Sequence, residues 1–97
     1  MLLAIDIGNT HITLGVFDND KIIHSWRLST EITRTEDELG VFIKNLLREF
    51  DIQNKVKNAV ISSVVVQLTE NVKKALEKYP KAGLQKEHHT FFSKKSS

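Results

Sequence analysis

The spacing of apolar residues changes along the chain and predicts a series of strands at its beginning. Residues 2–7 form a nearly continuous apolar run, which is typical of a strand covered on both faces. Apolar and polar residues then alternate over 11–17 and over 21–29, and the Asp-Asn-Asp segment at 18–20 is typical of a turn. This part of the chain therefore predicts three consecutive strands.

A helix start follows the third strand. Residues 35–38 read Thr-Glu-Asp-Glu, a capping box in which the Thr35 hydroxyl accepts from the Glu38 amide while the Glu38 carboxylate reaches back. Apolar residues then recur every three or four positions from Leu39 to Phe50. This stripe predicts an amphipathic helix that packs on the sheet.

A buried strand and a second helix complete the pattern. Residues 58–63 are largely β-branched and apolar, which favours a strand. Apolar residues from Leu68 to Tyr79 have helical spacing, and Pro80 is placed to end that helix. The predicted order is β-β-β-α-β-α, an α/β fold with a mixed sheet and helices packed on it.

The chain divides at its proline. We interpret residues 1–80 as the folded domain and 81–97 as an irregular basic tail, rich in Lys and Ser, that fits either a native extension or a vector or frame-altered origin. The fold is therefore expected to be truncated before a fifth strand. The open edge of the strand at 58–63 would then promote self-association or marginal stability.

The composition excludes several classes of protein. The chain has 97 residues, 40% hydrophobic and 27% charged, which fits one small globular domain. It contains no cysteine, which excludes disulfides and cysteine-based zinc sites and agrees with a cytoplasmic location. We expect no signal peptide, because the N-terminus has no basic region ahead of a long apolar core. We also expect no membrane partner, because no window reaches the roughly 18 apolar residues of a membrane span.

The net charge of +2 belongs to the tail. Residues 1–80 contain ten Lys and Arg against eleven Asp and Glu, whereas 81–97 contain four Lys against one Glu. No cluster of basic and aromatic residues occurs in the body of the chain. We therefore expect no nucleic-acid partner.

The first turn carries the most suggestive chemistry. Asp6 stands near the end of the first strand, and Gly8, Asn9 and Thr10 form a tight turn. One interpretation is a hairpin turn in which Asp6 caps local amides. The other is a phosphate cradle, in which Gly8 lets the backbone approach a phosphate while Asn9 and Thr10 supply donors. The glycine-rich pattern of a Walker loop is absent from the sequence.

Four ordered segments carry a family resemblance. They are DIGNT at 6–10, WRLST at 26–30, RTEDEL at 34–39 and ISSVV at 61–65. With these segments the chain resembles type III pantothenate kinases over about residues 1–79. That family belongs to the acetate kinase, sugar kinase, heat-shock chaperone and actin superfamily, so the resemblance implies a ribonuclease-H-like sheet.

The resemblance also implies an activity. Members phosphorylate pantothenate to 4′-phosphopantothenate with ATP, the first step of coenzyme A biosynthesis, in the bacterial cytoplasm and usually as homodimers. The implied cofactors are ATP, Mg²⁺ and a monovalent cation, K⁺ or NH₄⁺. The implied small-molecule partners are ATP and pantothenate.

The resemblance assigns the first turn to the nucleotide. It implies that Asp6 positions the metal and the phosphates, and that Gly8, Asn9 and Thr10 bind the phosphates. His11, next to the turn, is a further candidate for phosphate contact, although a lone histidine on a strand is usually structural or exposed.

Ser62 and Ser63 lie at the end of the fourth strand and keep two interpretations. Their hydroxyl groups either face the same cleft as Asp6 or end the strand by bonding to nearby backbone. The family typically has a proline where this chain has Val66, so the entry to the second helix is less constrained here.

No catalytic base can be nominated from the sequence. The family places it in a Gly-x-Asp-Arg segment, which does not occur in these 97 residues, so no catalytic residue is nominated. We therefore expect the chain to carry the first phosphate-binding motif but to be inactive alone. Two alternatives remain: an accessory or regulatory interaction module of the same family, and an inactive truncated fragment.

Overall fold

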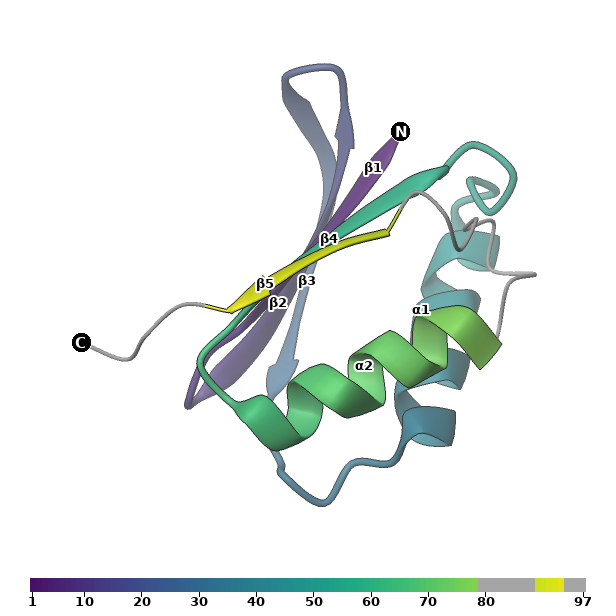
Figure 1. The fold of residues 1–97 in the computed structure, drawn as a ribbon. Helices are drawn as coiled ribbons and strands as arrows, with labels where there is room; N and C mark the ends of the chain where they lie inside the picture. The colour runs from purple at the N-terminus through teal and green to yellow at the C-terminus, as the bar shows by residue number, and fades with distance from the viewer. Residues whose placement is uncertain (79–88, 94–97) are drawn as a thin grey trace.

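The computed structural model describes residues 1–78 and 89–93 (Figure 1). These residues form five strands and two helices, and the first six elements follow the expected order β-β-β-α-β-α. The elements are β1 (Leu2–Ile7), β2 (His11–Asp18), β3 (Lys21–Ser29), α1 (Glu36–Glu49), β4 (Asn58–Ser63), α2 (Val66–Lys78) and β5 (His89–Ser93).

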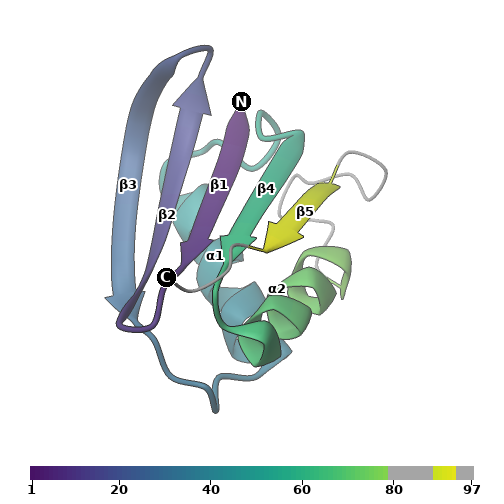
Figure 2. The same cartoon turned by 60° about the vertical axis from the view of Figure 1, so that its left-hand side comes forward.

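The strands form one mixed sheet in the order β3-β2-β1-β4-β5 (Figure 2). β2 pairs antiparallel with both β1 and β3, whereas β4 pairs in parallel with β1 and with β5. The α/β class and the mixed sheet are therefore confirmed. The carboxyl ends of β1, β3 and β4 lie at the same end of the sheet.

The expectation that the fold stops before a fifth strand is wrong. Residues 89–93 pair in parallel with β4, with Ala59 opposite His89 and Ser63 opposite Ser93. The free edge of β4, on which the expected self-association depended, is thus covered. β5 was missed because it is a short edge strand defined by backbone pairing with β4 and not by an apolar alternation of its own. Residues 89–93 of the predicted irregular tail therefore form a regular strand. The predictions for Tyr79, Pro80 and tail residues 81–88 and 94–97 lie outside the described residues.

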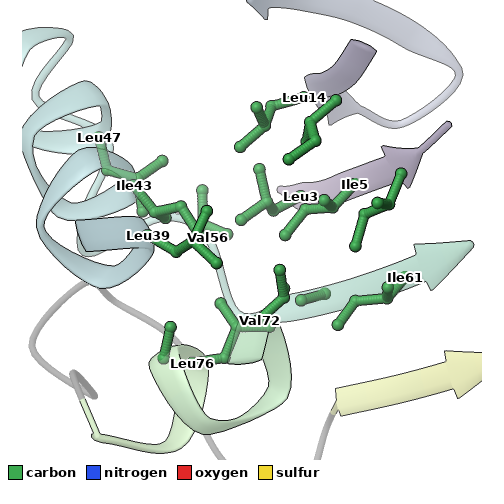
Figure 3. Close-up of a cluster of buried hydrophobic side chains, with 14 of the residues drawn as sticks. Leu3, Ile5, Leu14, Leu39, Ile43, Leu47, Val56, Ile61, Val72 and Leu76 are labelled. Atoms are coloured by element: carbon green, nitrogen blue, oxygen red, sulfur yellow. The ribbon is translucent and has the colours of Figure 1, made fainter. Parts of the chain in front are cut away.

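Both helices pack on one face of the sheet (Figures 1 and 2). Alternate residues of the central strands point to that face, and every third or fourth residue of each helix meets them (Figure 3). The core therefore lies between the sheet and the helices, where the alternate residues of the strands meet the apolar stripe of each helix. Its main members are Leu3, Ile5, Ile7, Leu14, Ile61, Leu39, Ile43, Leu47, Leu68, Val72 and Leu76.

The start of α1 agrees with the sequence pattern. The Glu38 N–H donates to the Thr35 Oγ1 at 3.1 Å, and the Thr35 N–H donates to the Glu38 Oε1 at 3.1 Å. These two hydrogen bonds satisfy the backbone N–H groups of Thr35 and Glu38, which would otherwise bond only to water. The predicted capping box is confirmed.

No helix in the part of the chain that the structure describes is long and apolar enough to cross a membrane.

A substitution at Leu47 tests the packing of α1 against the sheet. Its side chain is fully buried on α1, so Leu47→Ala is expected to lower the free energy of unfolding by about 2–5 kcal/mol, measured by urea denaturation. Val66 is 70% exposed at the start of α2, and Val66→Ala is the control, with an expected change within about 0.5 kcal/mol. Equal costs for the two variants would contradict this packing.

Candidate functional site

Four polar side chains cross the helix-free face of the sheet near the carboxyl end of β1. Asp6 lies opposite Thr13 of β2 and opposite Ser62 of β4, and Thr13 lies opposite Arg27 of β3. Residues paired in this way point to the same face, with neighbouring strands about 4.8 Å apart. We call Arg27, Thr13, Asp6 and Ser62 the polar row. Ser62 is half-buried and the other three are exposed.

The turn after β1 is closed by its own backbone. The Gly8 N–H donates to the His11 carbonyl oxygen at 2.9 Å. A Cβ atom on residue 8 would lie 3.2 Å from that same oxygen, which is tighter than most real contacts. Glycine is therefore explained by the turn itself, before any ligand is considered. Asn9 and Thr10 are exposed at the tip.

Thr30 ties this turn to the end of β3. Its N–H donates to the Thr10 carbonyl oxygen at 2.9 Å, and its Oγ1 donates to the Gly8 carbonyl oxygen at 2.8 Å. On the other side, the Val64 N–H donates to the Ile7 carbonyl oxygen at 3.0 Å. The turn is thus held from β3 and from the segment after β4.

His11 lies beside the turn, at the start of β2. It is exposed, it pairs with Ser29 of β3, and it falls two residues before Thr13 on the same strand face. The structure therefore brings the imidazole-bearing residue to the face of the polar row, while its backbone carbonyl closes the turn.

Ser62 and Ser63 separate onto opposite faces. Ser62 belongs to the polar row, whereas Ser63 is 1% exposed. The Ser63 hydroxyl accepts from the Val65 N–H at 3.0 Å and lies 3.1 Å from the Val65 carbonyl oxygen, to which it donates. Ser63 therefore closes the turn from β4 into α2, and only Ser62 shares the face of Asp6.

Arg27, Thr13 and Thr30 were not assigned to the site from the sequence. Arg27 and Thr30 do fall within the segment WRLST, whose position in the chain was the available signal. Their proximity to Asp6 or to the turn depends on the pairing of β1, β2 and β3, which alternation alone does not give.

The donor set fits a hard divalent cation held mainly by a substrate. Within residues 1–78 and 89–93, no group of three or more His, Cys, Asp or Glu side chains is placed to hold a metal ion. Mg²⁺ commonly binds through one or two carboxylates, with phosphates and waters as its other ligands. One carboxylate, Asp6, with the hydroxyl groups of Thr13 and Ser62 on either side, is compatible with that mode.

Substitutions at Gly8 and Gly15 test whether the turn after β1 requires glycine at position 8. Gly8→Ala should lower the free energy of unfolding by about 1–2 kcal/mol, because its Cβ meets a backbone oxygen that is itself bonded. Gly15→Ala is the control, since its Cβ would meet the Ile22 Cδ1 at 3.1 Å, the end of a side chain that is 54% exposed and can move. A cost of about 0.5 kcal/mol or less is expected there. Thermal and urea unfolding would measure both, and a larger cost at Gly15 would contradict the description of the turn.

A solved structure shares the fold. Thermus thermophilus RuvC, solved in complex with a Holliday junction substrate, aligns with a TM-score of 0.61 and 17% identity over 95% of this chain and 63% of that chain. At this identity the likeness concerns the fold alone. The expected ribonuclease-H-like architecture is thereby confirmed.

Sequence relatives and a family model identify the family within this fold. The type III pantothenate kinase of Finegoldia magna is 42% identical over 80 residues, and that of Geotalea uraniireducens is 41% identical over 80 residues. Each match covers 81% of this chain but only 30% and 31% of the relatives, so the chain spans about a third of their length. The family model for type III pantothenate kinase matches residues 2–91. The chain therefore belongs to the type III pantothenate kinase family.

Proposed function

We propose that this chain forms the nucleotide-phosphate side of an active site that transfers the γ-phosphoryl group of ATP to pantothenate. The observation that carries the proposal is the placement of Asp6 beside a closed, doubly anchored turn at the carboxyl end of the central strand. In open α/β sheets, ligands bind at that end of the strands.

The turn offers polar groups suited to phosphate oxygens. The Gly8 N–H is used within the turn, so Asn9 and Thr10, both exposed, are the residues that would meet a phosphate. α2 begins at the same end of the sheet, and its first turn contains no acidic residue. The partial positive charge of a helix start is therefore not cancelled near the proposed phosphates.

Asp6 is the residue that would hold or orient Mg²⁺. When bound, the ion would neutralise charge on the phosphate oxygens during transfer. Thr13 and Ser62 flank Asp6 in the polar row and would bond to waters or phosphate oxygens beside it. Arg27, at the end of the row, adds a guanidinium group that suits an anionic ligand. The monovalent cation implied by the family has no assigned ligand among the described residues.

The acceptor side of the reaction is proposed to come from elsewhere. No carboxylate in this chain is nominated as the base that accepts the pantothenate hydroxyl proton, and the Gly-x-Asp-Arg segment does not occur in it. The pantothenate site, the homodimer and the cytoplasmic location belong to this proposal on the strength of the family.

Asp6 gives the direct test. In a full-length enzyme that carries this segment, Asp6→Asn should lower kcat at least about a hundredfold, because charge stabilisation at the phosphates is lost. The fold should change little, since Asp6 is exposed. Asp18→Asn is the matched control, an exposed aspartate at the far end of β2 that should leave kcat near that of the parent. An Asp6→Asn enzyme as active as its parent would remove Asp6 from the mechanism.

The isolated chain gives a second test. A purified 97-residue sample should produce no pantothenate-dependent ADP, because it lacks the Gly-x-Asp-Arg segment in which the family places the base. A coupled ADP assay measures this, with a full-length relative as the positive control. Pantothenate-dependent ADP production by the isolated chain, lost in Asp6→Asn, would show that these residues suffice and would contradict the division proposed here.

A further inference from the structure

Thr30 opens the connector between β3 and α1, residues 30–35, at the end of the sheet that carries the turn (Figure 2). It makes two hydrogen bonds to the turn, one from its backbone and one from its side chain. The side-chain bond joins residues 22 positions apart and is partly buried. A partly buried carbonyl that loses its donor is costly, so this contact constrains the turn.

The side-chain bond fixes the direction of one peptide group. Because a peptide unit is planar, holding the Gly8 carbonyl oxygen also holds the N–H of Asn9, which points the opposite way in a trans peptide. The Thr30 hydroxyl therefore sets the direction of the Asn9 N–H, which points away from Thr30. The backbone N–H of Thr30 does not hold this peptide group, because it donates to the Thr10 carbonyl oxygen instead.

Other contacts hold Thr30 itself in place. The Arg34 Nε donates to the Ser29 carbonyl oxygen at 3.3 Å, and the Asn71 Nδ2 of α2 donates to the Arg34 carbonyl oxygen at 2.9 Å. These bonds run from α2 through the connector to the residue before Thr30. The hydroxyl group of Thr30 is thus presented from a fixed backbone, which is what a positioning residue requires.

We propose that Thr30 is a positioning residue for nucleotide binding, whose hydroxyl holds the Gly8–Asn9 peptide in the orientation that receives the ATP phosphates. It acts through the turn and does not touch the phosphates. This inference rests on the proposed function of the turn and adds to it a residue that the phosphate motif itself does not contain.

The first experiment measures the turn without nucleotide. In the ligand-free 97-residue chain, Thr30→Val removes the hydroxyl at nearly constant volume, and the Gly8 amide, which is bonded to His11, should exchange with solvent about tenfold faster. Thr30→Ser restores the hydroxyl and should exchange like the parent. Thr33→Val, an exposed threonine of the same connector, is the matched control and should change nothing at Gly8.

The second experiment measures the nucleotide. In a full-length enzyme carrying this segment, Thr30→Val should raise the KM for ATP about tenfold and leave the KM for pantothenate within about twofold. Thr30→Ser should restore the KM for ATP. If Thr30→Val does not fold, Thr30→Ala is compared with Thr30→Ser in the same assays.

The outcomes separate the two proposals. An unchanged KM for ATP in Thr30→Val, or an equal rise in Thr30→Ser, overturns the role of the hydroxyl while leaving the Asp6 result to stand. Equal rises in the KM for ATP and for pantothenate also overturn it, because they indicate general damage. If Asp6→Asn is fully active, the proposed function fails whatever Thr30 does.

Discussion

The register of β1 is the constraint on which the rest of the structure depends. β1 is the central strand, antiparallel to β2 and parallel to β4, and its residues alternate between the helix-covered face and the open face. Burial of Ile5 and Ile7 against the helices leaves Asp6 between them on the open face. A slip of one residue would bury the carboxylate and expose two isoleucines. The apolar run thus fixes the position of its one charged residue.

The same register assembles the remaining site from distant parts of the chain. Asp6 meets Ser62 only because β4 runs parallel to β1, which requires the crossover through α1. The turn after β1 is held from one side by Thr30 and from the other by Val64. Its geometry is therefore a property of the whole sheet end and not of the five-residue motif DIGNT alone.

The features that could be predicted from the sequence are those determined by residues close together in the chain. Strands with an apolar run or an alternation, and a helix with its capping box, follow from spacing within a few residues, and β1 to α2 were found in this way. β5 depends on pairing with β4 across many residues, so its own sequence carried little signal. Ser62 and Ser63 could not be told apart, because the strand period that separates them must be set by a neighbouring strand and by the turn into α2. The role of Thr30 could not be predicted from the sequence either, because its hydrogen-bond partners lie about 20 residues earlier, in the turn after β1.

The likeness to RuvC bears on how far fold can be used as an argument. A ribonuclease-H-like sheet shared over 95% of this chain at 17% identity fixes where a ligand can sit, at the carboxyl end of the central strand, but not which ligand it is. That choice depends on side chains. A sheet end with one carboxylate flanked by hydroxyl groups, and a first helical turn without acidic residues, suits a metal bound largely by phosphates. In the proposed function, the groups of the phosphate side are positioned by contacts within β1 to α2, whereas the acceptor side is proposed to take its base from elsewhere.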